Sequence, residues 1–185
     1  MPLLSNTTPR GKIDLILGGA RSGKSRFAET EAEAYPEKIY IATAERDKSG
    51  LDHEMTARIK AHQDRRGENW QSIEEPIEIY SIIDNKSRCG NVILIDCLTL
   101  WLSNLMHHQK DLDLHTSRLI ESLGKAEGAI IMVTNEVGLS IVPENALARR
   151  FRDEQGRLNQ ILAKAAHNVV FIAAGLPLCL KGSTS

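Results

Sequence analysis

Short runs of consecutive apolar residues alternate along the chain with longer stretches in which apolar residues recur every three or four positions. The runs are rich in β-branched side chains and are bounded by polar or turn-forming residues, which is typical of strands buried on both faces. They predict strands at Ile13–Leu17, Lys38–Thr43, Asn91–Asp96, Ala129–Val133 and Val169–Ala173. A further short strand is predicted at Leu178–Leu180, just after Pro177.

The stretches between these runs have the apolar spacing of helices that bury one side. They predict helices at about Lys24–Ala34, Asp52–Arg66, Leu98–His108, Leu112–Lys125 and Glu144–His167. Pro143 stands just before the last and longest of these helices, near the position where proline favours a helix start.

Continuous apolar strands that alternate with helices indicate an α/β fold, with a mostly parallel sheet covered by helices on both faces. A chain of 185 residues suffices for one domain with a sizeable core. We therefore predict a single domain over residues 13–185, preceded by a disordered lead-in at residues 1–12. Because ligands bind such sheets at the carboxyl ends of the strands, side chains that directly follow the strands become the candidates for function.

Composition and charge limit which classes of binding partner and which cellular compartment fit this chain. With 42% hydrophobic and 25% charged residues, the chain is typical of a globular protein and not of a disordered one. A net charge of −1 gives no overall field that would draw nucleic acid or an anionic membrane, and no apolar run approaches the roughly 20 residues of a membrane-spanning helix. The start of the chain lacks a secretory signal, and the three cysteines form no C-x-x-C motif. We expect a cytoplasmic protein that binds neither nucleic acid nor membrane.

The segment "GGARSGKS" (Gly18–Ser25) matches the phosphate-loop motif G-x-x-x-x-G-K-[ST] in full. It directly follows a predicted strand and opens a predicted helix, which is the structural context that the motif requires. Glycines let backbone N–H groups turn toward phosphate oxygens at the helix N-terminus. The motif predicts that Lys24 reaches the β- and γ-phosphates of a nucleotide and that the Ser25 hydroxyl ligates Mg²⁺.

A carboxylate at the end of a neighbouring strand usually completes the magnesium site of a phosphate-loop protein. Asp96, which closes the run "VILID", is the natural candidate for this role. Glu136 also follows a strand and is a weaker candidate for the same pocket, with a helix-capping role equally open. The chain has no N-K-x-D motif, since its only "NK" is Asn85–Lys86, and this disfavours a signalling GTPase.

His62 lies in a cluster of basic residues. On a helix, Arg58, His62, Arg65 and Arg66 fall at i, i+4, i+7 and i+8 and therefore share one stripe. The spacing alone favours a histidine packed on the inner edge of the helix, and it is also compatible with an imidazole presented to an anionic ligand. The residues by themselves leave both interpretations open.

Several segments together resemble a known family. They are "GGARSGKS" (18–25), "YIAT" (40–43), "DHEM" with the following "ARI", His62 and Asp64, and above all "VTNEVGLSIVPENALARRFRDEQGRLNQ" (133–160). The chain is similar over Ile13–Lys181 to the bifunctional adenosylcobinamide kinase/adenosylcobinamide-phosphate guanylyltransferase family of cobalamin biosynthesis.

The resemblance implies a two-step enzyme with an α/β fold of the P-loop NTPase (RecA-like) type. ATP or GTP first phosphorylates adenosylcobinamide, and GTP then transfers GMP to that phosphate through a GMP–histidine intermediate, which gives adenosyl-GDP-cobinamide. The substrates are small molecules, Mg²⁺ accompanies the nucleotides, and the protein is expected to form a homo-oligomer such as a trimer.

The resemblance also assigns site residues. It makes His62 the point of GMP attachment, beside Lys24 as the second catalytic residue, and it places the magnesium ligands at Ser25 and Asp96. Asp96 stands where members of the family often have glutamate. The nucleotide-binding positions that carry over are Gly18, Gly19, Ala20, Arg21, Ser22, Gly23, Lys24, Ser25, Thr43, Ala44, Glu45, Gln63, Asp64, Arg65, Arg66, Glu74 and Asp96.

Two other interpretations remain open. A single-activity P-loop kinase without guanylyl transfer would not require His62 and its arginines. A nucleotide-binding regulatory module would carry out no covalent chemistry. The five other histidines have no charged constellation around them and are expected to face solvent; they are His53, His107, His108, His115 and His167.

Overall fold

The computed structural model describes residues 11–45 and 69–182. Its strands are β1 (Ile13–Gly18), β2 (Glu37–Ala42), β3 (Trp70–Glu74), β4 (Asn91–Asp96), β5 (Ala129–Asn135), β6 (Asn168–Ala173) and β7 (Leu176–Lys181). Its helices are α1 (Lys24–Ala32), α3 (Ile79–Lys86), α4 (Leu98–His107), α5 (Leu112–Lys125) and α6 (Ala146–Ala165). None of these described helices has both the length and the apolar character needed to cross a bilayer.

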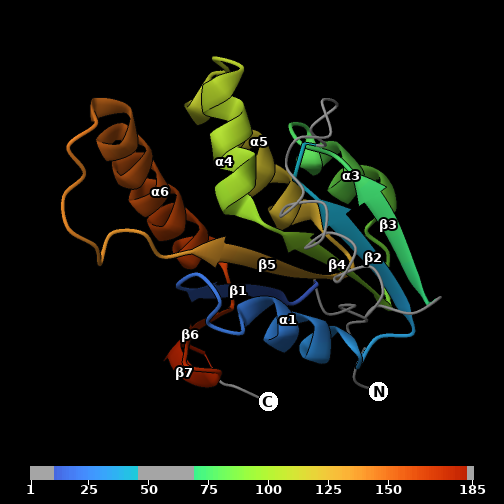
Figure 1. Ribbon diagram of the computed structural model, residues 1–185. Helices are drawn as coiled ribbons and strands as arrows, with labels where there is room; N and C mark the ends of the chain where they lie inside the picture. The colour runs from blue at the N-terminus through green and yellow to red at the C-terminus, as the bar shows by residue number, and fades with distance from the viewer. Residues whose placement is uncertain (1–10, 46–68, 183–185) are drawn as a thin grey trace, which may run out of the picture.

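The described strands form one sheet in the order β3-β2-β4-β5-β1-β6-β7 (Figure 1). Neighbouring strands are parallel except for β6 and β7, which form an antiparallel hairpin at one edge. The central strand β1 is buried along its whole length, as a parallel strand covered on both faces should be. This arrangement confirms the predicted α/β fold, and it brings the carboxyl ends of β1, β4 and β5 side by side.

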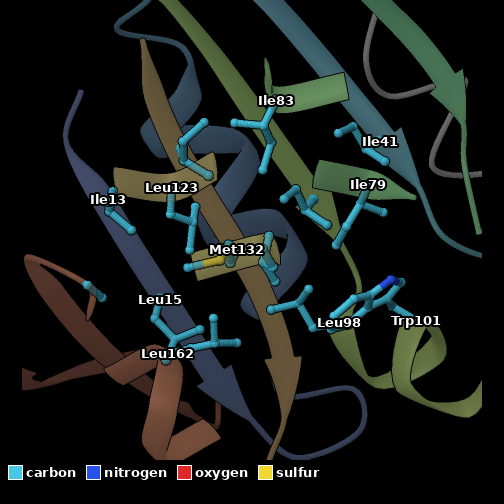
Figure 2. Close-up of a cluster of buried hydrophobic side chains, with 14 of the residues drawn as sticks. Ile13, Leu15, Ile41, Ile79, Ile83, Leu98, Trp101, Leu123, Met132 and Leu162 are labelled. Carbon is cyan, nitrogen blue, oxygen red and sulfur yellow. The ribbon is translucent and has the colours of Figure 1, made fainter. Parts of the chain in front are cut away.

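Helices cover both faces of the sheet. On one face, alternate residues of the strands pack against α3, α4, α5 and α6, and Figure 2 shows this core with Leu15, Met132, Leu98 and Trp101 among its labelled side chains. The Trp101 indole is completely buried, and its Nε1 donates a hydrogen bond to the Ile77 carbonyl at 2.7 Å. The opposite face packs against α1, which lies under the sheet in Figure 1.

The strands and helices predicted from the apolar pattern are present wherever the structure describes them, with shifted ends. The last helix begins at Ala146 and not at Glu144, because the Asn145 side chain caps it by accepting hydrogen bonds from the backbone N–H groups of Leu147 and Ala148. The helix predicted at Asp52–Arg66 and most of the predicted N-terminal lead-in lie outside the described residues.

The pattern missed two elements, β3 and α3. The β3 segment "WQSIE" leaves Gln71, Ser72 and Glu74 exposed at the edge of the sheet, so it lacks the continuous apolar run of a central strand. The α3 segment "IYSIIDNK" is short, and its apolar residues resemble a strand as much as a helix. In both cases the tertiary position, and not the local pattern, decides the element.

Candidate nucleotide-binding site

The phosphate loop joins β1 to α1, and two of its glycines are required by the geometry. A Cβ atom at Gly18 would lie 2.5 Å from Ser22 Oγ and 2.6 Å from the Ile172 carbonyl oxygen, so no larger residue fits there. Gly23 has a φ of 100°, a left-handed conformation that favours glycine, and it directly precedes the first residue of α1. The loop is therefore built from its own backbone folded tightly against β6.

The charged and polar groups of this loop are positioned for an anion. The Lys24 side chain is largely buried, and its Nζ donates to the Gly19 carbonyl at 2.8 Å, which draws the ammonium group across the loop. No side chain caps the N-terminus of α1, and the buried Ser22 hydroxyl has no hydrogen-bond partner among the described residues. An uncapped helix N-terminus beside an ammonium group attracts phosphate.

The hairpin at the sheet edge also contacts the loop. The Gly175 backbone N–H, in the turn between β6 and β7, donates to the Ser22 carbonyl at 2.9 Å. A Cβ atom added at Gly23 would lie 3.4 Å from the Cα of Gly175. The segment that follows β6 thus fixes the outer side of the phosphate loop. Nothing in the local sequence of either segment predicts this contact.

Asp96 ends β4, and its position in the sheet is set by the register with Ala42 on β2 and Val133 on β5. The pKa of the adjacent Cys97 thiol is raised to about 11, chiefly by burial and also by the Asp96 carboxylate, while the Lys24 ammonium opposes the shift. In the strand order β4-β5-β1, the end of β4 and the phosphate loop after β1 lie at the same carboxyl edge of the sheet, with β5 between them. The sheet therefore places the carboxylate and the loop lysine that the motif predicts along one edge.

Thr43 holds the turn after β4 in place. Its completely buried hydroxyl donates to the Cys97 carbonyl at 2.7 Å and accepts from the Cys97 N–H at 2.9 Å. Asn104 on α4 donates to the Thr43 carbonyl at 2.7 Å. Within the described residues, both hydrogen bonds of the Thr43 hydroxyl go to Cys97, the residue that follows Asp96. Thr43 therefore holds the backbone of the turn that begins at Asp96.

The remaining predicted residues lie farther along the same edge. Ala44 is half-buried, and Glu74 is exposed at the end of β3, opposite Ala42 in the register. The Glu45 carboxylate lies 2.7 Å from Nε2 of His108 at the end of α4. Glu45 is the last residue described before the segment that contains His62.

Glu136 follows β5 beside the phosphate loop, and it caps none of the described helices. Its backbone N–H donates to the Gly18 carbonyl at 3.1 Å, and its carboxylate accepts from the Gly138 N–H at 2.6 Å. The backbone of Glu136 therefore ties β5 to the loop, while its side chain closes the local turn.

The structure thus gathers the phosphate loop (Gly18–Ser25), Thr43–Glu45, Glu74 and Asp96 at the carboxyl edge of one sheet. His62 and Gln63–Arg66 lie outside the described residues, and their roles stay predictions.

Comparison with known proteins identifies the family. The family model "Cobinamide kinase / cobinamide phosphate guanyltransferase" matches residues 14–180. The chain belongs to this family. The match confirms the resemblance seen in the sequence and, with it, a nucleotide-using enzyme of the kinase and nucleotidyltransferase classes.

Individual relatives agree with this assignment. The bifunctional adenosylcobalamin biosynthesis protein CobP of Pseudomonas aeruginosa is 46% identical over 172 residues, covering 91% of this chain and 97% of the relative. The bifunctional adenosylcobalamin biosynthesis protein CobU of Salmonella typhimurium is 37% identical over 182 residues, covering 90% of this chain and 98% of the relative. Among solved structures, the flagellar accessory protein FlaH of Methanocaldococcus jannaschii superposes with a TM-score of 0.52 at 15% identity, covering 96% of this chain and 83% of that one. The last likeness concerns the fold alone.

Sequence reasoning missed a group of polar residues behind the site in this family member. Gln155 and Asn159 lie one turn apart on α6 and are buried, together with Thr134 near the end of β5. The inward face of this helix is otherwise lined with Leu158 and Leu162. Two amide side chains at i and i+4 on that apolar face are the sequence signal from which a buried polar cluster could have been predicted. Their hydrogen bonds reach the backbone of the site and are described below.

His115 corrects the expectation that the histidines outside the basic stripe face solvent. It is buried on α5, with Nδ1 3.5 Å from the Tyr80 hydroxyl, which also accepts a hydrogen bond from Arg118 at 3.2 Å. Burial lowers the pKa of His115, and the cationic side chains of Arg118 and Lys110 lower it further against two acidic neighbours. The expectation failed because α3, which supplies Tyr80, was itself missed.

Proposed function

We propose that this enzyme phosphorylates adenosylcobinamide with ATP or GTP and then transfers GMP from GTP to the resulting phosphate, which yields adenosyl-GDP-cobinamide and pyrophosphate. The observation that carries the proposal is a complete phosphate loop at the same carboxyl edge of the sheet as a strand-end carboxylate, Asp96, in a chain whose family is named for these two activities. Both steps use a nucleoside triphosphate, so a single triphosphate pocket suffices for both.

In the kinase step the substrate hydroxyl oxygen bonds to the γ-phosphorus, and the bond from that phosphorus to the bridging oxygen breaks, releasing the nucleoside diphosphate and the hydroxyl proton. Such transfers depend mainly on positioning and on stabilising negative charge. Lys24 is suited to this role because its ammonium group already lies across the loop, 2.8 Å from the Gly19 carbonyl oxygen that a phosphate oxygen would replace as its partner. The N-terminus of α1 supplies further positive potential.

We propose that Mg²⁺ accompanies the nucleotide and is held by the Ser25 hydroxyl and the Asp96 carboxylate. Both are oxygen donors, as this hard cation prefers, and they reach the pocket from the first turn of α1 and the end of β4. The described residues contain no group of three or more His, Cys, Asp or Glu side chains arranged for a metal. That donor set fits a magnesium ion that is held by one carboxylate together with substrate phosphates. The bound ion would neutralise charge on the phosphates.

For the guanylyl step we propose His62 as the nucleophile. An imidazole with a pKa of about 6.5 is roughly three-quarters neutral at pH 7, and the nearby arginines would favour the neutral form. One ring nitrogen bonds to the α-phosphorus of GTP as pyrophosphate leaves, and the ring then loses its proton. A phosphate oxygen of the cobinamide phosphate next attacks the same phosphorus, and the P–N bond breaks as the ring takes up a proton from water, which restores the histidine.

The other nucleotide contacts are proposed by family position. Gln63, Asp64, Arg65 and Arg66 would bind GTP next to the histidine, and Thr43–Glu45 and Glu74 would line the same edge of the sheet. For Thr43 the support favours a role in holding this edge in place, since its hydroxyl, N–H and carbonyl are hydrogen-bonded to Cys97, Asp96 and Asn104. The contact of the Glu45 carboxylate with His108, at 2.7 Å, places Glu45 against the end of α4.

The covalent step is tested by incubating the protein with GTP labelled at the α-phosphorus. We expect label to appear on the protein, to be lost in acid and to persist in base, as a phosphoramidate should behave. His62→Asn should abolish labelling, while His107→Asn, which replaces an exposed histidine of α4, should leave it unchanged. Label that persists in His62→Asn would refute the role of His62. Kinase activity without any labelling would identify a single-activity kinase.

The shared pocket is tested with Lys24→Ala. We expect this variant to lose activity in both half-reactions, by about a hundredfold or more, because one lysine serves both triphosphates. Lys164→Ala removes an exposed lysine of α6 and serves as the control. Two half-reactions that respond differently to Lys24→Ala would contradict the single-pocket proposal.

We also propose that the protein works in the cytoplasm as a homo-oligomer, such as a trimer. Exposed apolar side chains support an interface: Leu139 and Ile141, in the connection between β5 and α6, are 84% and 93% exposed, and Leu176 and Leu178 of β7 are 71% and 58% exposed. Light scattering after size-exclusion chromatography should give a multiple of the chain mass, and Ile141→Asp should reduce it. A monomer in the unaltered protein would refute the proposal.

A further inference from the structure

A cluster of three buried polar side chains lies between α6 and the end of β5. Gln155 Nε2 donates to Thr134 Oγ1 at 3.0 Å and to Asn159 Oδ1 at 2.9 Å, and the Thr134 hydroxyl donates to Asn159 Oδ1 at 3.0 Å. Gln155 and Thr134 are fully buried and Asn159 is 6% exposed. We refer to Gln155, Asn159 and Thr134 as the amide cluster.

One contact fixes the orientation of every group in the amide cluster. Asn159 Nδ2 donates to the Asn135 carbonyl at 3.1 Å, and a carbonyl only accepts, so the amide nitrogen of Asn159 must point to the backbone. Its oxygen then faces the cluster and accepts hydrogen bonds, which among the described residues come from the amide nitrogen of Gln155 and the Thr134 hydroxyl. The cluster therefore has a single consistent hydrogen-bond pattern.

The amide cluster ends on the backbone of Asn135, where the two halves of the nucleotide site meet. While the Asn135 carbonyl accepts from Asn159, its N–H donates at 2.8 Å to Thr99 Oγ1, in the first turn of α4. Asn135 stands opposite Gly18 in the β1–β5 register, and the next residue, Glu136, donates to the Gly18 carbonyl at 3.1 Å. One residue thus links the start of the phosphate loop to the helix that begins two residues after Asp96.

Stability alone does not explain this arrangement. The orientation that satisfies Asn159 leaves Gln155 Oε1 buried without a hydrogen-bond partner among the described residues. A buried acceptor without a partner is destabilising, and an apolar side chain of similar length would fill the same space without that penalty. The Gln155 amide is better explained by what its nitrogen holds in place.

We propose that Gln155 and Asn159 are positioning residues for the transfer reactions: through Thr134 and the Asn135 backbone they fix the spacing between the phosphate loop and the Asp96 turn. The inference rests on the proposed function, since the spacing matters only if Lys24 and Asp96 act on one triphosphate. Neither amide contacts substrate. Errors in the spacing of reacting groups of about 1 Å reduce transfer rates by about a hundredfold, so a cluster of this kind can control the rate without contributing to nucleotide affinity.

The first test compares Gln155→Met with Gln160→Met, a matched change at an exposed position of the same helix. We expect Gln155→Met to lower kcat of the kinase step by about tenfold or more, with little change in KM for the nucleotide and no loss in melting temperature. Amide hydrogen exchange in the peptide that covers Gly18–Ser25 should become faster. Gln160→Met should change neither quantity.

A second pair keeps the test valid if Gln155→Met fails to fold. Thr134→Val removes the hydroxyl at nearly constant shape, and Thr134→Ser retains it. We expect Thr134→Val to lower kcat and accelerate exchange in the phosphate loop, and Thr134→Ser to restore both. Wild-type values of kcat and of exchange in Gln155→Met and Thr134→Val would overturn the inference, as would losses that track melting temperature alone. A wild-type protein that transfers no phosphoryl group, but whose loop exchange still responds to these variants, would refute the proposed function and leave the positioning role standing.

Discussion

The Thr43 hydroxyl offers a quantitative test of how the Asp96 turn is held. Thr43→Val keeps the shape of the side chain but removes both hydrogen bonds to Cys97, of 2.7 and 2.9 Å, at a completely buried position. Within the described residues, the Cys97 N–H would lose its acceptor, while the Cys97 carbonyl would keep the hydrogen bond that the Trp101 N–H donates to it at 3.1 Å. The substitution therefore leaves one buried backbone N–H without its partner and removes one of two hydrogen bonds from the carbonyl.

The expected loss adds the cost of the unpaired Cys97 N–H to that of the hydrogen bond lost at the Cys97 carbonyl. An unpaired buried group costs about 1–3 kcal/mol and a lost hydrogen bond about 0.5–1.5 kcal/mol, so Thr43→Val should lower the free energy of unfolding by about 2–4 kcal/mol. For a chain of this size, 1 kcal/mol corresponds to a change of about 2–4 °C in Tm, which gives a decrease of roughly 5–15 °C. Thr43→Ser keeps the hydroxyl and loses one methyl group, and it should cost only about 1 kcal/mol.

Equilibrium unfolding in urea, followed by tryptophan fluorescence, measures this difference because Trp101 is fully buried. Thermal unfolding gives an independent value. If Thr43→Val were as stable as Thr43→Ser, the hydroxyl would not support the Asp96 turn, and the account of this edge of the sheet would be wrong. The same pair should separate in kinase activity, with Thr43→Val the slower enzyme, since Cys97 follows the predicted magnesium ligand.

Three further predictions follow from single groups. Because its pKa is raised to about 11, the Cys97 thiol should resist iodoacetamide at about pH 8, whereas the exposed Cys89 and Cys179 react; equal labelling of all three in the folded protein, measured by mass spectrometry, would contradict this. Since the pKa of His115 is lowered on folding, the unfolded chain takes up a proton more readily, and stability should fall as the pH drops below about 6.5; His115→Leu should show less of this loss in urea titrations, and an unchanged pH profile would refute the assignment. Lys181 Nζ donates to three carbonyls at the end of α6, so Lys181→Met should cost about 1 kcal/mol, visible as a lower Tm; a Tm equal to the wild type would show that these bonds contribute nothing.

Most of the fold could be predicted because its elements are encoded locally. A buried parallel strand needs a continuous apolar run, so β1, β4 and β5 stand out in the sequence, and the phosphate-loop motif identifies the turn after β1. The edge strand β3 and the short helix α3 carry no comparable signal, because exposure at the sheet edge and brevity remove the pattern. Their absence from the prediction also hid the burial of His115 against Tyr80.

The candidate site divides in the same way. Lys24, Ser25 and the loop glycines lie in one contiguous segment, so their chemistry can be recognised without knowledge of the fold. The role of the Thr43 hydroxyl cannot be recognised in this way, because its partner Cys97 is 54 positions distant in the chain. The function itself came from a long family-specific segment, and that segment proves to contain the amide cluster.

The sequence by itself determined the fold class, the phosphate loop and the family, because each depends on residues that are close together in the chain. Only the tertiary structure decided that the β6–β7 turn braces the loop through Gly175, that Thr43 holds the Asp96 turn, and that Gln155 and Asn159 end on the backbone of Asn135. These contacts depend on strand order and register, which bring together backbone groups from distant parts of the chain. Hydrogen bonds of that kind are set by the geometry of the assembled sheet, and no local pattern of apolar and polar residues encodes them.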